Sequence, residues 1–146
     1  MELSLKSEYA ILAMLELANH FAIDQPLQIR QIANQQNIPD RYLEQLLATL
    51  KRQGLVKSQR GAKGGYILAR EPWEISLLEI VRGIEGYDPI SEKSSKSGNE
   101  SASLSVIHEA WETAQKAASN VLDACTLKDL CDRQRQRQIA TTMYYI

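Results

Sequence analysis

The chain has 146 residues, with 17 Lys and Arg against 18 Asp and Glu, and 44% of its residues are hydrophobic. That length suits one domain with a sizeable core. No apolar run approaches the roughly 20 residues of a membrane span, and the N-terminus has no basic region followed by an apolar stretch. We therefore expect a soluble, cytoplasmic protein.

Charge is unevenly distributed along the chain. Residues 1–70 hold nine Lys and Arg against six Asp and Glu, a net of +3, and the remainder holds eight against twelve, a net of -4. A basic half favours contact with nucleic acid. No set of nucleophile, base and orienting residue is visible, and no glycine-rich phosphate loop leads into a helix, so an enzyme is the least favoured class.

Two helices are expected first. Residues 5–21 have apolar side chains on more than one face, which predicts a helix buried from two sides, between a DNA-binding unit and a dimer helix. Leu27, Ile29, Ile32 and Ala33 give a second, short apolar face. It is broken at Asn37, a residue type that tolerates the left-handed conformation of a tight turn.

A third helix follows that turn. It has an apolar stripe at helical spacing, made by Leu43, Leu46, Leu47 and Leu50. Pro39 and Asp40 suit its first turn, and Gly54 suits its end. The opposite face is polar and mixed in charge, comprising Arg41, Glu44, Gln45, Ala48 and Arg52. Such a face is often merely solvated, so it does not by itself indicate a binding site.

A basic hairpin comes next. Residues 55–60 and 66–68 read as strands, with glycines between them that allow the chain to reverse. Arg60 and Lys63 lie at the tip, flanked by Lys57 and Arg70, and clustered cations favour phosphate contact. The succession of two short helices and a basic hairpin predicts a winged helix-turn-helix, in a fold that is mainly α with a small β-hairpin wing.

The second half is expected to join this unit to a dimer helix. Residues 76–84 read as a helix, with Ser76 as its cap and Glu79 in the capping-box position. Residues 88–103 are rich in serine and charge and read as a flexible loop. The predicted organisation is a winged helix-turn-helix domain over residues 1–87, that loop, and a dimerisation helix with a C-terminal tail over residues 104–146.

A heptad seam marks the long helix. Apolar and small residues alternate steps of three and four along Leu104, Ile107, Trp111, Ala114, Ala118, Val121 and Cys125. We expect the first six to form a homodimer interface with the same helix of a second chain. The alternative is that the seam packs only on the first helix of its own chain. A two-fold dimer would read a pseudo-palindromic site on double-stranded DNA.

The motifs S-L-K-S-E-Y-A-I-L-A-M-L-E-L-A, R-Y-L-E-Q-L-L and G-L-V-K-S-Q-R-G-A-K-G-G-Y-I-L-A resemble the Rrf2 family of bacterial winged-helix transcription regulators. The resemblance implies that Tyr42, Glu44 and Gln45 in the recognition helix, and Arg60 in the wing, contact DNA. Gln45 could pair with adenine, Glu44 could accept from cytosine, and Arg60 could enter a narrow minor groove or clamp phosphate. We also expect Arg41 and Lys63 to contact the DNA backbone.

Many members of that family hold an iron–sulfur cluster on three cysteines and a histidine. Here His108 stands at the histidine position, but Ser105 replaces the nearest cysteine and residues 88–103 contain none. Cys125 and Cys131 lie beyond those positions; on one helix, six residues would separate them by about 240°, too far to bridge or share a metal. We therefore expect no metal and no cofactor, and an iron–sulfur sensor is disfavoured.

The cysteine-poor pattern and the C-terminus are similar to a branch of the family typified by a repressor of cysteine metabolism. In that branch the regulator binds O-acetylserine sulfhydrylase, whose active site accepts C-termini ending in isoleucine. Tyr144, Tyr145 and Ile146 fit such a docking peptide. The alternative is that the tail folds onto its own dimer.

Two functional classes follow. The first is a DNA-binding regulator, expected to be a repressor of cysteine, sulfur or iron–sulfur metabolism genes. The second is an interaction protein that docks a metabolic enzyme such as O-acetylserine sulfhydrylase, with DNA binding secondary.

Overall fold

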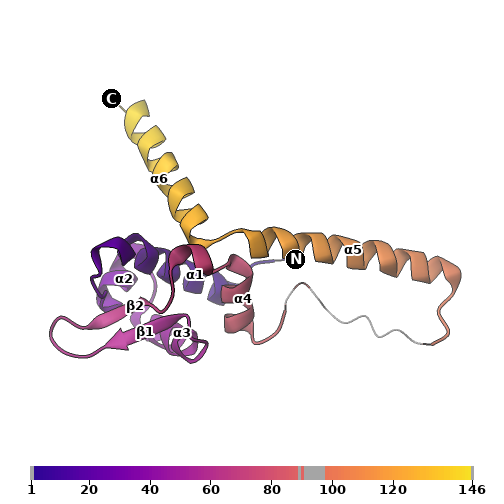
Figure 1. Ribbon diagram of the computed structural model, residues 1–146, viewed down its shortest axis with the longest axis horizontal. Coiled ribbons are helices and arrows are strands. Elements are labelled where there is room, and N and C mark those ends of the chain that lie inside the picture. The colour runs from indigo at the N-terminus through magenta and orange to yellow at the C-terminus, as the bar shows by residue number, and fades with distance from the viewer. Residues whose placement is uncertain (1, 89, 91–97, 146) are drawn as a thin grey trace.

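The computed structural model describes residues 2–88, 90 and 98–145. Helices α1–α4 and one hairpin form a body, from which α5 and α6 extend in different directions (Figure 1). This confirms the mainly α fold with a small β-hairpin. The elements are α1 Leu5–Asn19, α2 Ile29–Gln36, α3 Asp40–Arg52, β1 Val56–Gln59, β2 Gly65–Leu68, α4 Leu77–Glu85, α5 Ala102–Ala124 and α6 Leu127–Tyr144, with short 3-10 turns at Phe21–Ile23 and Pro72–Glu74.

Helix α1 is the central helix of the body. It packs against α2 and α3 on the DNA-binding side, and against α4 and α6 elsewhere. The expectation that it is buried from two sides is confirmed, although α6 occupies the place where the dimer helix was expected. At its N-terminus, the hydroxyls of Ser4 and Ser7 donate to the carboxylate of Glu85 in α4, the second over 2.7 Å. These two hydrogen bonds lower the pKa of Glu85 from its ordinary value.

The helix-turn-helix unit forms as the sequence predicts. Asn37 ends α2 in the left-handed region at a φ of 58°. Leu43, Leu46, Leu47 and Leu50 are the buried residues of α3. Pro39 is the N-cap of α3, one position outside the first turn, and Gly54 follows the C-cap at a φ of 75°. Leu27 was expected on the apolar face of the second helix, but it lies before α2 and not within it.

Residue Leu27 instead anchors the hairpin. Strands β1 and β2 are antiparallel, pairing Val56 with Leu68 and Gln59 with Gly65. Leu27 and Tyr66 exchange two backbone hydrogen bonds of 3.0 and 2.8 Å, which attach the wing to the start of α2. A side chain on Gly65 would meet the carbonyl oxygen of Leu27 at 2.4 Å, so only glycine permits this approach.

Helix α4 begins with the predicted cap, in which the hydroxyl of Ser76 accepts from the backbone N–H of Glu79 over 3.1 Å. The carboxylate of Glu79 turns instead to Arg70. Half of the loop predicted over residues 88–103, namely residues 89 and 91–97, lies outside the described residues. Ile90, however, is only 4% exposed, so the start of that segment is packed, and α5 already begins at Ala102.

The region predicted as one dimerisation helix and a tail contains two helices. Between them, the carbonyl of Cys125 accepts from Leu77 N–H over 2.8 Å, and Leu127 N–H donates to the carbonyl of Ile75 over 3.0 Å. Thr126 caps α6 in a reciprocal capping box with Asp129. Cys125 and Cys131 therefore do not share a helix, and the prediction made for one continuous helix does not apply.

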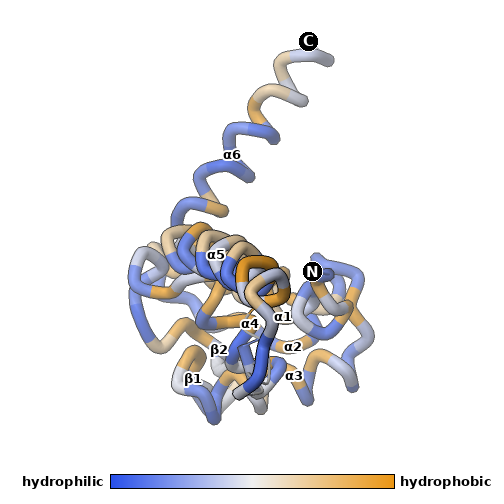
Figure 2. Tube along the Cα trace, turned by 90° about the vertical axis from the view of Figure 1, so that its right-hand side faces the viewer, coloured by the Kyte–Doolittle hydropathy of each residue, from blue (hydrophilic) through white to orange (hydrophobic). Residues whose placement is uncertain are grey.

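Helix α6 then packs its first turns on α1. Leu127 and Cys131 are buried, and Asn19 donates to the side-chain oxygen of Gln134 over 2.9 Å. Burial raises the pKa of the Cys131 thiol. Figure 2 shows α6 as a mostly hydrophilic helix rising from the body, and it shows hydrophobic positions on α5, which is viewed nearly end-on. None of the described helices has the length and apolar character needed to cross a membrane.

Candidate nucleic-acid interface

The outward face of α3 is the first part of the interface. Because the leucine stripe fixes the helix on the core, Arg41, Glu44 and Gln45 are exposed on its other side, together with Ala48 and Arg52. The predicted orientation of this face is confirmed. Among the described residues, no ion pair involves Arg41, so its guanidinium is available to contact a phosphate.

Residue Tyr42 has a different environment from its neighbours on α3. Its ring is half-buried and meets the ring of Tyr9 in α1 edge to face, with the centroids 5.6 Å apart. Such a contact helps to hold α3 against α1. The contact of Tyr42 with DNA stays a prediction.

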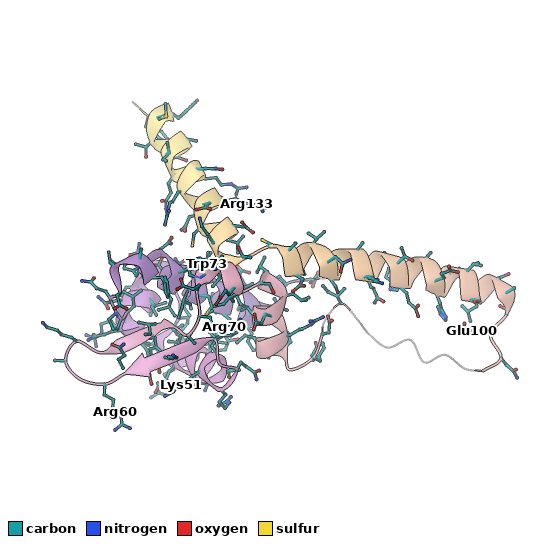
Figure 3. All side chains as sticks on the ribbon, viewed as in Figure 1. Lys51, Arg60, Arg70, Trp73, Glu100 and Arg133 are labelled. Atoms are coloured by element: carbon teal, nitrogen blue, oxygen red, sulfur yellow. The ribbon has the colours of Figure 1, made fainter. Side chains whose placement is uncertain are left out.

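The hairpin tip forms the second part. Arg60 and Lys63 are exposed, and neither belongs to an ion pair within the part of the chain that the structure describes. Figure 3 shows Arg60 extending from the hairpin into solvent. Two unpaired cations at the end of a narrow hairpin can approach the DNA backbone at little desolvation cost.

A contact that the sequence analysis missed joins the two parts. The ammonium group of Lys51, near the end of α3, donates to the hydroxyl of Ser58 in β1 over 2.6 Å. This bond links the wing directly to the recognition helix. No local pattern reveals it, because it depends on the register of the hairpin.

One flanking cation is not available to DNA. Arg70 turns back to α4, where its Nη2 lies 2.5 Å from Oε2 of Glu79. The prediction that Arg70 adds to the phosphate-binding cluster is therefore wrong. Its charge is used within the fold, and it ties the end of the wing to α4.

The predicted dimer seam lies on α5. No residue of α5 is buried by the rest of its own chain. Ile107, Trp111 and Val121 in the seam are 61%, 69% and 68% exposed. Helix α5 extends away from α1 (Figure 1) and approaches the body at its C-terminal end, beside α4. The alternative in which the seam is covered by the first helix of the same chain is therefore wrong.

A short helix, a left-handed turn, a recognition helix with a polar outer face and a basic hairpin together define a winged helix-turn-helix DNA-binding protein. The family model described as "Rrf2: Iron-dependent Transcriptional regulator" matches residues 3–133. The chain belongs to the Rrf2 family.

Similar proteins and solved structures agree with this family assignment. The chain is 39% identical to the HTH-type transcriptional regulator CymR of Bacillus subtilis over 146 residues, which are 100% of both chains. It resembles the solved structure of CymR, titled the global cysteine regulator of B. subtilis, with a TM-score of 0.80 and 38% identity over 91% of this chain and 98% of that one. The chain also resembles the solved structure of IscR from T. potens, with a TM-score of 0.77 and 38% identity over 94% of this chain and 91% of that one.

The protein is therefore a DNA-binding transcription regulator. Its named relatives are transcriptional regulators. The reading as an interaction protein with secondary DNA binding is not favoured.

The iron in the family's description raises the question of metal ligands. The described residues contain no group of three or more His, Cys, Asp or Glu that could hold an ion. His108 lies on α5 with its Nδ1 against the carboxylate of Glu100, and Ser105 provides no thiolate one turn away. Cys125 and Cys131 lie at the other end of α5 and on α6. This donor set does not fit an iron–sulfur cluster.

Proposed function

We propose that this regulator binds DNA as a homodimer formed through the α5 seam. The observation that carries the proposal is the exposure of Trp111, Ile107 and Val121 on one face of a helix that its own chain does not cover. Leu104, Ala114 and Ala118 continue the same face, and the alanines allow two helices to approach closely. Large apolar side chains arranged in this way are typical of a protein–protein interface.

Light scattering on a sizing column tests the dimer. Trp111→Asp places a charge in the seam and should convert the dimer into a monomer. Trp73→Asp is the matched control, because Trp73 is 56% exposed and belongs to the Pro72–Glu74 turn, which packs against α6 and contributes no residue to the seam. It should leave the mass unchanged. A Trp111→Asp protein that remains dimeric and folded would refute the seam.

A two-fold dimer would present two recognition helices to one face of the duplex, separated by about one helical turn or a multiple of it. We infer a pseudo-palindromic operator from this geometry. Gln45 and Glu44 would read base edges at the centre of each half-site, while Arg41, Arg60 and Lys63 would contact the backbone or the minor groove. Tyr42 would add a further contact.

The regulated genes are proposed from the relatives. The likeness to CymR over the whole chain supports control of cysteine or sulfur metabolism genes, and iron–sulfur metabolism genes remain the wider class that the family resemblance implies. We propose repression as the direction. A chromatin pull-down from the native cell, compared with transcript levels after gene deletion, should recover promoters of such genes with raised transcripts. Recovery of unrelated promoters, or lowered transcripts, would contradict the proposal.

We further propose that the protein works without an iron–sulfur cluster, on the support of the donor set around His108. Protein purified without oxygen should contain no iron and no inorganic sulfide. Stoichiometric iron and sulfide would overturn this proposal.

A second proposal concerns the C-terminus, which we infer docks O-acetylserine sulfhydrylase. Tyr144 and Tyr145 are 86% and 82% exposed, at the end of a helix that stands clear of the body (Figure 1). Ile146, the third residue of the docking peptide, lies outside the described residues. An exposed apolar tip of this kind is suited to insertion into an active-site pocket.

Deletion of Ile146 tests this partner. Binding to purified O-acetylserine sulfhydrylase, measured by calorimetry, should be lost. Met143→Ala, which removes an apolar side chain one turn earlier on α6, should bind as the unaltered protein does. Unchanged binding after the deletion would refute docking through the tail.

A further inference from the structure

A polar cavity lies between the recognition unit and the dimer helix. It has a volume of about 390 Å³ and is bounded by the end of α3, by α4 and by the end of α5. The side chains that matter here are Gln53, Glu79, Arg82 and Asp123, with Gly83 between them. The volume is within the usual range of small-molecule sites. None of these residues was singled out for DNA contact or for the seam.

The position of Gly83 on α4 helps to shape this cavity. A Cβ atom there would approach Cγ of Gln53 to 3.2 Å. Because glycine stands there instead, the side chain of Gln53 can lie close against α4. Gln53 is the C-cap residue of α3, so one wall of the cavity is formed by the end of the recognition helix.

The cavity is lined by anionic and cationic side chains, and several of their polar atoms make no described hydrogen bond. Among the described residues, no cation pairs with Asp123, whose Oδ1 accepts only from Ser76, over 3.3 Å. Arg82 directs Nε and Nη2 to Oδ2 of Asp88, over 3.2 and 2.6 Å, and its Nη1 makes no described hydrogen bond. Oε1 of Glu79 and the carboxamide of Gln53 likewise make none.

We propose that this cavity binds a small zwitterion of the α-amino acid type. The ammonium group would lie between the carboxylates of Asp123 and Glu79. The carboxylate group would take Nη1 of Arg82 and the amide N–H of Gln53. A site that offers groups of both charges would discriminate a zwitterion from a simple amine or a simple acid, since either of these leaves one set of charged groups without a partner.

The site stays accessible in the proposed dimer. Asp123 follows the seam residue Val121 by two positions, which places it about 200° around α5, on the opposite face. An occupant would touch α3 through Gln53, α4 through Glu79 and Arg82, and α5 through Asp123. If the proposed dimer holds, occupancy would bias the angle between the recognition helix and the dimer helix, and so the spacing of the half-sites.

Calorimetric titration of the full chain tests the site without DNA, so its failure is separate from failure of the proposed function. The probes are the twenty common L-amino acids at millimolar concentration, each titrated alone. At least one should bind with one molecule per chain. The tightest is then compared with its decarboxylated amine and its deaminated acid, and each should bind at least about tenfold more weakly.

Three variants locate the binding. Asp123→Asn and Arg82→Gln remove one negative and one positive charge from the cavity and should each weaken binding at least about tenfold. Glu109→Gln, a similar change on an exposed part of α5 outside the cavity, should have no effect. Thermal unfolding checks that the variants fold. If one cavity variant does not fold, the other is sufficient for the test. Absence of binding by every probe, an amine that binds as well as the amino acid, or indifference to both cavity variants would each overturn the proposal.

Discussion

Neutralising the wing should reduce the salt dependence of DNA binding by a definite amount. Arg60 and Lys63 are exposed at the hairpin tip, and no described ion pair uses either. Each phosphate contact contributes about 0.9 to the slope of log K against log salt concentration. The double variant Arg60→Ala/Lys63→Ala loses two cations per chain, and therefore four per dimer. The slope should become less steep by about 3 to 4.

Fluorescence anisotropy with a labelled operator, measured over a series of KCl concentrations, gives this slope. The matched control is Lys128→Ala/Arg135→Ala on α6, which removes the same charge from an exposed surface away from the wing. Its slope should match that of the unaltered protein. A wing variant with an unchanged slope, or a control with the same loss, would refute contact between the wing and the DNA backbone.

Three further predictions concern the fold. Gly65→Ala should lower the free energy of unfolding by more than about 2 kcal/mol, because the new Cβ would meet Leu27; urea unfolding with near-native stability would contradict this. Ser7→Ala should cost about 1–2 kcal/mol at neutral pH. The pKa of Glu85 is lowered in the folded state, so this stabilisation is lost as pH falls through the folded pKa, and an equal cost in acid would be inconsistent. Cys131, whose pKa is raised, should react with iodoacetamide more slowly than Cys125 at neutral pH; equal labelling of the two peptides in mass spectrometry would argue against its burial.

Much of the DNA-binding unit could be predicted from local patterns. The leucine stripe of α3 is set by helical periodicity, and Asn37 and Gly54 take the left-handed conformations that their residue types tolerate. These features depend on a few neighbouring residues. The exposure of Arg41 and Gln45 then follows from the burial of the stripe.

Features that depend on long-range contacts were missed. The pairing of Arg70 with Glu79 requires the wing to return beside α4, and the cavity around Gly83 requires α3, α4 and α5 to meet. The break between α5 and α6 is different, because Thr126 and Asp129 have the spacing of a capping box, and that signal was present in the sequence. The regular heptad seam continues up to Cys125 and so obscures this helix start.

Selection of binding sites from a random DNA library by the full-length protein tests the central claim most directly. A dimeric winged-helix regulator should enrich an inverted repeat, with two half-sites whose centres lie about one helical turn or a multiple of it apart. The enriched site should lose affinity when Gln45→Ala is introduced. An asymmetric motif, a single half-site, or no enriched sequence would contradict the account.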